Sequence, residues 1–160
     1  MHAMAGLYSP PTGRTQGSIK SEANGIFSRL GIASGKKVDL IAEIRRGFSV
    51  SVIDKLVLEL AIPQQALLQT LSLSSATLTR RRAQKQKRLT PLESDRVYRI
   101  ATIYRAALEL FESDREAARD WLNEPAKALG GNSPLQHLDT EAGTDEVQDL
   151  IYRLEHGVIT

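Results

Sequence analysis

The sequence predicts an all-α fold built around a helix-turn-helix bundle. From about residue 36 onward, apolar residues recur three or four positions apart, which is the spacing of one face of a helix. No segment alternates apolar and polar residues in the manner of a half-buried strand. Capping residues and Gly or Pro breaks divide the apolar stripes into short helices joined by tight turns.

The first four helices are predicted between the start of the apolar stripes and the run of basic residues. One helix begins near Lys36 and stops at Gly47, and a second ends before Pro63. That proline lacks an N–H and therefore suits the first turn of a third helix. Ser74 offers a hydroxyl to cap a fourth helix. The third and fourth helices, joined by a turn at Ser72, form the predicted helix-turn-helix.

The remaining helices are marked by their own capping residues. Thr90 with Glu93 forms a capping box that opens a long fifth helix, and Ser113 with Glu116 repeats the pattern for a sixth. Gly and Pro breaks interrupt the chain over residues 125–134, after which a short helical turn follows. The last predicted helix carries Val147, Leu150, Ile151 and Leu154, and Gly157 caps its end.

The charge is divided along the chain. Residues 1–105 hold 17 Lys and Arg against 7 Asp and Glu, whereas residues 106–160 hold 4 against 12. We therefore divide the chain into residues 1–35, a flexible N-terminal arm rich in Gly and Ser, residues 36–105, a helix-turn-helix DNA-binding and dimerisation domain, and residues 106–160, an acidic C-terminal domain. A basic half suits nucleic acid, and an acidic half suits a protein partner.

The basic run lies on the fourth predicted helix and just after it. Six cations fall within the nine positions 80–88, and in a helix-turn-helix the second helix presents its N-terminal residues to the major groove. Arginine binds guanine or phosphate in bidentate fashion, and short hydroxyl side chains let the backbone approach. A solvated basic helix without a ligand is the alternative. The predicted DNA-binding residues are Ser74, Ser75, Thr77, Arg80, Arg81, Arg82 and Lys85.

Several classes of protein are not expected. The chain has no cysteine, hence no disulfide framework or thiolate metal site, and a cytoplasmic location is the default. No apolar stretch reaches the length of a membrane span. His137 and His156 have no ligating neighbours, so we predict neither a metal nor a cofactor. We find no nucleophile and base in a catalytic arrangement and do not expect an enzyme.

Residues 121–160 carry the most specific pattern. It runs from Trp121-Leu122 through Pro125, Ala128-Leu129-Gly130-Gly131, Ser133-Pro134-Leu135 and Leu138-Asp139-Thr140-Glu141-Ala142-Gly143 to Leu154-Glu155-His156-Gly157-Val158. With this pattern and the Leu89-Thr90-Pro91 segment, most of residues 40–160 resembles the antitoxin family called Xre, ParS or MbcA, whose partners are RES-domain toxins. The resemblance implies a dimerising helix-turn-helix half that represses its own operon and a C-terminal half that covers the toxin's active-site cleft.

RES toxins, by the same resemblance, degrade NAD⁺ or transfer ADP-ribose from it. An enzyme that binds an anionic dinucleotide has a cationic cleft, which the acidic C-terminal domain matches in charge. Gly157-Val158-Ile159-Thr160, with its free carboxylate, is a candidate plug for that cleft, and simple fraying of this segment is the alternative. The toxin-binding residues that we predict are Gly130, Gly131, Leu135, Asp139, Glu141, Arg153, Glu155, His156, Gly157, Val158, Ile159 and Thr160.

The predicted function is therefore that of a type II antitoxin that neutralises a RES-domain toxin and binds operator DNA as a homodimeric autorepressor. A stand-alone helix-turn-helix regulator is the alternative, and a structural adaptor without DNA binding is a third possibility. Departures at Ser72, where Gly is usual, and at Leu68, where a small residue is usual, bear on the DNA contacts more than on the toxin contacts.

Overall fold

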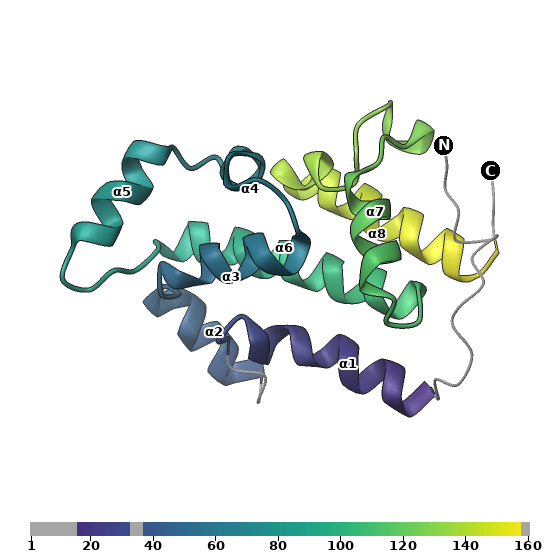
Figure 1. Ribbon diagram of the computed structural model, residues 1–160, viewed down its shortest axis with the longest axis horizontal. Coiled ribbons are helices and arrows are strands. Elements are labelled where there is room, and N and C mark those ends of the chain that lie inside the picture. Colours follow the sequence, from purple (N-terminus) through teal and green to yellow (C-terminus); the bar gives the residue numbers. More distant parts are fainter. Residues whose placement is uncertain (1–15, 33–36, 158–160) are drawn as a thin grey trace. The chain divides into compact units, whose positions relative to one another are not determined.

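The computed structural model describes residues 16–32 and 37–157 of the chain. These residues form eight α-helices and two short 3-10 helices, with one isolated bridge between Ser49 and Arg88 as their only strand-like pairing (Figure 1). The all-α prediction is confirmed. The chain divides into two compact units, one comprising Gly25–Ala101 and the other comprising Met1–Asn24 with Thr102–Thr160.

The unit Gly25–Ala101 is a bundle of short helices around an aliphatic core. Its apolar faces are buried as the three- and four-residue spacing predicts, with Ile53, Leu56, Leu67 and Leu71 almost fully covered. Burial of each such side chain contributes about 1.5–3 kcal/mol. The unit contains α2 (Lys37–Arg46), α3 (Ser51–Leu60), α4 (Gln64–Leu71) and α5 (Ser75–Ala83), together with the end of α1 (Gln16–Arg29) and the start of α6 (Pro91–Leu110).

The turns of this unit depend on capping groups that the sequence largely revealed. Ser74 caps α5 as predicted, because its Oγ accepts a hydrogen bond from the Thr77 N–H at 3.0 Å. The capping box at α6 is also confirmed, with Thr90 N–H donating to Glu93 and Glu93 N–H donating to the Thr90 hydroxyl. Pro63 lies one residue earlier than predicted, as the extended N-cap of α4.

One set of hydrogen bonds, which we call the loop clamp, joins residues 47–50 to residues 87–94. Leu89 N–H donates to Phe48 O at 2.9 Å, Val50 N–H donates to Lys87 O at 2.8 Å, and Phe48 N–H donates to the buried Ser94 hydroxyl at 2.9 Å. Gly47 has φ 92°, and a Cβ there would overlap the Leu89 carbonyl oxygen. The clamp therefore needs glycine at this position and holds the segment after α5 against the α2–α3 connection.

The N-terminal arm predicted for residues 1–35 differs from the structure where it is described. Residues Gln16–Arg29 form α1, and residues 1–15 and 33–36 lie outside the described part. Composition pointed to a mobile segment because Gly and Ser dominate, but the few apolar residues share one face. Ala23, Ile26, Phe27, Leu30 and Ile32 are buried, and this burial offsets the ordering of the segment.

The second unit contains α7 (Arg115–Asn123), the 3-10 helices η2 (Lys127–Leu129) and η3 (Gln136–Asp139), and α8 (Glu141–Glu155). The capping box predicted at Ser113 and Glu116 is wrong, because Asp114 accepts the hydrogen bond from Ala117 N–H. Ser113 instead adopts φ 66° and donates its N–H to Leu108 O in the turn that ends α6. Both residue types cap helices well, and the sequence could not choose between them.

Thr140 caps α8, and Gly143 brings its first turn against η3. The Thr140 Oγ1 accepts from Gly143 N–H at 2.9 Å, and a Cβ on Gly143 would overlap the carbonyl oxygen of His137. Because the obstacle is backbone, no side-chain rotation can relieve it. The close approach of η3 and α8 therefore requires glycine at position 143.

Gly143→Ala is expected to destabilise the protein by about 2 kcal/mol or more, because η3 must move away from α8. The measurement is the free energy of unfolding from urea titration followed by circular dichroism. Gly17→Ala is the matched control, since a Cβ there meets nothing within 4 Å in α1 and alanine favours a helix by up to about 1 kcal/mol. Equal stability of the two variants would contradict the close approach.

Candidate functional sites

The helix-turn-helix consists of α4 and α5. Ser72 ends α4 in the left-handed conformation, with φ 54° and ψ 42°, the position where glycine is usual. The turn is held because Leu73 N–H donates to Leu68 O at 2.9 Å, and Leu68, Leu73 and Leu78 are buried. The departures at Ser72 and Leu68 are therefore accommodated, and α5 retains an exposed face for a ligand.

Two of the predicted DNA-binding hydroxyls serve the helix itself. Ser74 caps α5, and its Oγ also donates to Thr77 Oγ1 at 2.8 Å, so this pair is engaged at the helix start. Ser75 is exposed and reaches Gln65 only at 3.5 Å. Of the three predicted hydroxyls, Ser75 is the one most open to a ligand.

Arg81 is a structural residue rather than the exposed DNA contact that the sequence suggested. Its guanidinium makes hydrogen-bonded ion pairs with both carboxylate oxygens of Glu93, at 2.5 and 3.4 Å, and the two side chains are only 14% and 13% exposed. Burial raises the pKa of Glu93, but hydrogen bonds from Arg81 and the Thr90 amide, with the Arg81 charge, outweigh burial and leave that pKa below its ordinary value of 4.5. The pair ties α5 to α6.

The other predicted cations are open to solvent to different degrees. Arg82 donates to Asp54 at 2.7 Å in an exposed pair, which contributes at most about 1 kcal/mol and can open for a ligand. Arg80 and Lys85 are exposed and have no ion-pair partner among the residues that the structure describes. The structure therefore leaves Arg80, Arg82 and Lys85 available near the end of α5.

The predicted toxin-binding residues lie around the ends of α8 and on the preceding turns. Gly130 and Gly131 are exposed with positive φ after η2, as expected for a helix stop. Leu135 differs from the prediction, because it is 4% exposed and therefore belongs to the core. The exposed members are Asp139 at the end of η3, Glu141 at the start of α8, and Glu155, His156 and Gly157 at its end, whereas Val158, Ile159 and Thr160 lie outside the described residues.

The end of α8 has an ordered aromatic pair. The Tyr152 and His156 rings stack with centroids 4.1 Å apart. His156 Nδ1 lies 2.9 Å from the Tyr152 carbonyl oxygen, and because a carbonyl only accepts, Nδ1 is the donor. This bond satisfies one of the last carbonyls of the helix, which is the role that the position of His156 predicts.

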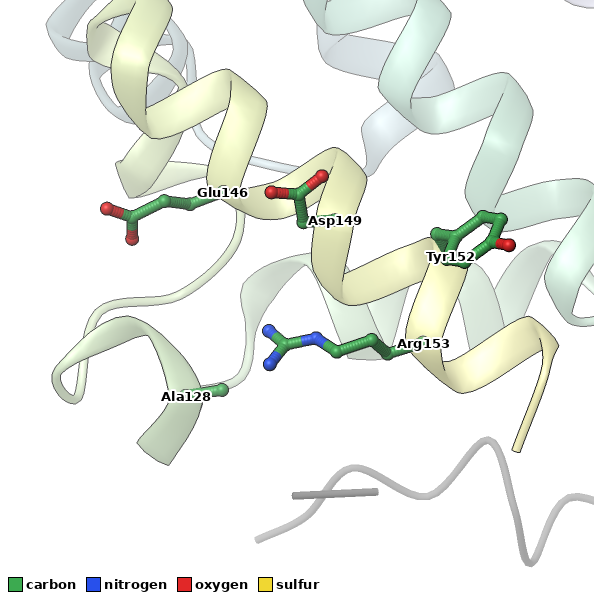
Figure 2. Close-up of a pocket in the computed structure, with 5 residues that line it drawn as sticks. All are labelled: Ala128, Glu146, Asp149, Tyr152 and Arg153. Carbon is green, nitrogen blue, oxygen red and sulfur yellow. The ribbon is translucent and has the colours of Figure 1, made fainter. Parts of the chain in front are cut away.

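Arg153 lines a surface pocket of about 430 Å³ together with Ala128, Glu146, Asp149 and Tyr152. Figure 2 shows its guanidinium extending from α8 toward Ala128 on η2. The Arg153 Nε is buried and has no hydrogen-bond partner among the described residues. The arginine and the two carboxylates that line this pocket are suited to hydrogen-bonding side chains of a partner.

Sequence reasoning found Arg153 but missed its neighbours. Glu146, Asp149 and Arg153 follow a three- and four-residue spacing, so the signal was a polar stripe on one face of the last helix. Tyr152 was missed because its position beside the apolar stripe gave no sign of exposure, yet its side chain is 61% exposed. Exposed tyrosine is enriched at protein interfaces.

Two findings bear on other functions. Within residues 16–32 and 37–157, no three side chains of His, Asp or Glu come together as a metal site would need. None of the helices described there combines the length and apolar character required to cross a bilayer.

Comparison with known proteins places the two halves of the chain in related families. Residues 39–101 match the model for the antitoxin Xre-like helix-turn-helix domain. Residues 106–157 match the model for the antitoxin Xre/MbcA/ParS C-terminal toxin-binding domain. The second match covers η2, η3 and α8, including the Arg153 pocket.

Curated relatives extend over nearly the whole chain. A protein named antitoxin Xre from Yersinia enterocolitica is 39% identical over 140 residues, which cover 88% of this chain and 94% of the relative. Antitoxin Xre from Photorhabdus laumondii is 30% identical over 143 residues, covering 89% and 96%. A Sphingobium protein named Prs ADP-ribosylating antitoxin is 26% identical over 151 residues, covering 88% and 94%.

The pKa of Glu93 is lower in the folded protein than its ordinary value, so the ionised carboxylate stabilises the fold. This contribution to the free energy of unfolding is present above about pH 4.5 and is lost as the pH falls through the folded pKa. The free energy of unfolding is therefore expected to decrease with acid in the parent protein and to do so less in Glu93→Gln. The measurement is urea unfolding at several pH values between about 3 and 7.

Arg81→Gln and the double variant complete a cycle for this pair. A coupling free energy of about 1 kcal/mol is expected at neutral pH, because each single change leaves a partly buried partner unpaired. Additive effects of the two substitutions, with unchanged pH dependence in Glu93→Gln, would contradict the structural role of the pair.

Proposed function

The chain belongs to the Xre/MbcA/ParS antitoxin family, and we propose that it neutralises a RES-domain toxin by covering the toxin's active site and that it represses its own operon. The observation that carries the proposal is the union of a helix-turn-helix domain and a toxin-binding domain in one chain. The first domain supplies DNA binding, and the second supplies the toxin contact.

Electrostatics support the toxin half of the proposal. Residues 106–160 carry 12 Asp and Glu against 4 Lys and Arg, and a cleft that binds NAD⁺ presents positive charge to the anionic dinucleotide. The name of the Sphingobium relative, which refers to ADP-ribosylation, fits a partner that consumes NAD⁺. A complementary acidic surface speeds encounter and disfavours wrong partners.

The Arg153 pocket and the end of α8 offer the contact surface. Tyr152 is large, exposed and held by its stack on His156, which lowers the entropy lost on binding. Arg153 lines the same pocket as Tyr152. We place the centre of the toxin contact here, with Glu141, Glu155, His156 and Gly157 around it and with Leu135 as a supporting core residue.

The DNA half of the proposal rests on α5. Ser75, Arg80, Arg82 and Lys85 are its exposed candidates, while Ser74, Thr77 and Arg81 support the helix. One short helix on a monomer gives little affinity, so a dimer reading paired half-sites is expected. Val38 and Ile41 on α2 and Leu58 on α3 are exposed large apolar side chains in the same unit, and they are suited to a dimer contact.

We also infer that the chain acts by binding rather than by catalysis. The Arg153 pocket combines an arginine, two carboxylates and a tyrosine, and these lining residues include no pair of nucleophile and base. A toxin-binding domain can act through a complementary surface without a reaction of its own.

Arg80→Gln is expected to weaken binding to operator DNA about tenfold and to reduce the salt slope by about 1, because one phosphate or base contact is removed. Fluorescence anisotropy with labelled duplex at several salt concentrations measures both. Lys127→Gln removes the same charge from the exposed surface of the other unit and should have little effect. Equal affinities for the two variants would contradict DNA binding through α5.

Tyr152→Ala is expected to weaken binding to the RES-domain toxin by about 2 kcal/mol, or roughly 30-fold, because a large exposed tyrosine at the centre of a contact loses its buried area on truncation. Leu92→Ala is the matched control, because Leu92 is equally exposed at 61% but lies in the helix-turn-helix domain. Calorimetry with an inactive toxin gives the affinities, and growth of cells that express active toxin reports neutralisation. Full neutralisation and unchanged affinity in Tyr152→Ala would contradict the proposed role of Tyr152 in toxin binding. Failure of the parent chain to bind any RES toxin would contradict the antitoxin proposal and favour the stand-alone regulator.

A further inference from the structure

A second pocket lies in the unit Gly25–Ala101, and no residue of α5 lines it. It has a volume of about 200 Å³, enough for several water molecules and for a group of phosphate size. Its walls come from residues 30–32 just after α1, the end of α2, the start of α3 and the loop clamp. The polar and charged residues that line it are Glu43, Arg46, Ser49, Ser51, Lys55 and Arg88.

The cations of this pocket have no ion-pair partner among residues 16–32 and 37–157. Arg46, Lys55 and Arg88 are exposed, and none of them pairs with a carboxylate in the part of the chain that the structure describes. Some other arginines of the same unit are paired with carboxylates, as Arg29 is with Glu59 and Arg82 with Asp54. Three cations that face one cavity repel one another unless an anion joins them, and the single carboxylate in the wall, Glu43, leaves an excess of positive charge.

The donors are held in place by the surrounding backbone. Arg88 is fixed by the loop clamp, and its Nη1 donates to Gly47 O at 2.9 Å, which leaves its remaining guanidinium N–H groups for a ligand. Lys55 lies over Gly31, where an added Cβ would be 2.9 Å from Nζ. The Ser49 and Ser51 hydroxyls are 3.0 Å apart at the same wall. Prepositioned donors lose little entropy on binding.

We propose that this pocket binds a phosphate group through Arg46, Lys55 and Arg88, with Ser49 and Ser51 as hydroxyl donors. A phosphate has several acceptor oxygens and at least one negative charge, so it can use cationic and hydroxyl donors together. The phosphate comes either from the backbone of bound DNA or from a free phosphate compound. The proposal goes beyond the proposed function, because neither toxin binding nor base contacts from α5 require such a pocket.

The variants Lys55→Gln and Arg46→Gln test the proposal, and Arg45→Gln is the matched control. Arg45 is exposed on the same helix as Arg46, loses the same charge and does not line the pocket. In one titration, inorganic phosphate is added to the full chain and binding is monitored by the amide NMR signals of Gly31, Ser49 and Ser51. In a second titration, binding of a short DNA duplex of random sequence is measured by fluorescence anisotropy. Circular dichroism and the melting temperature confirm that each variant is folded.

Both pocket variants are expected to bind the phosphate-bearing probe about tenfold more weakly, whereas Arg45→Gln stays close to the parent. If the pocket variants lose affinity for the duplex alone, the bound phosphate comes from the DNA backbone. If they lose affinity for inorganic phosphate, it comes from a free phosphate compound. Parent-like binding of both probes by Lys55→Gln and Arg46→Gln overturns the proposal, as does an equal loss in Arg45→Gln. A duplex affinity that falls in Arg80→Gln but not in the pocket variants removes the pocket and leaves the α5 proposal intact.

Discussion

The loop clamp is the constraint on which the helix-turn-helix unit depends. It joins residues 47–50 to residues 87–94 and thereby closes the chain segment that contains α3, α4 and α5. The entropy cost of closing a loop rises only slowly with the length of the loop. A few hydrogen bonds are therefore enough to hold the ends of this long segment together. Because the clamp also includes Arg88, the same bonds that stabilise the fold set a cation beside the pocket between α1, α2 and α3.

The basic run at positions 80–88 illustrates how one charge cluster is divided between structure and function. Arg81 is turned inward to Glu93, Arg82 lies in an exposed pair with Asp54, and Arg88 donates to the backbone of Gly47. Arg80 remains open to solvent. Mutual repulsion within this run of like charges is therefore reduced, because Arg81, Arg82 and Arg88 each have a different partner.

The sequence predicted the helices well where local chemistry decides. Ser74 and the Thr90–Glu93 box were identified because a capping residue acts within three positions of itself. The cap of α7 was assigned to Ser113 instead of Asp114 because two suitable capping residues are adjacent. Ser113 belongs to the turn that ends α6, so Asp114 caps α7. Helix α1 was not predicted because the Gly and Ser content of the N-terminal segment indicated a flexible arm, and the apolar face that is buried there consists of only a few residues.

The sites were less accessible to sequence reasoning, because they depend on distant partners. The residues near Arg81 in the sequence do not indicate that it pairs with Glu93, which lies on another helix. The burial of Leu135 follows from tertiary packing. The resemblance of residues 121–160 to a known family found the toxin-binding domain, and the family models bear this out. It could not show that Tyr152 and Arg153 border one pocket, which needs the three-dimensional arrangement of α8 and η2.

Helix α6 has a consequence for any attempt to separate the two halves. It runs over Pro91–Leu110, while the compact units divide at Ala101 and Thr102, inside the helix. A protease or an expression fragment that cut there would split one hydrogen-bonded helix and leave each piece with only about half of its length. Fragments that keep the whole of α6 are therefore the better tools for studying either half alone.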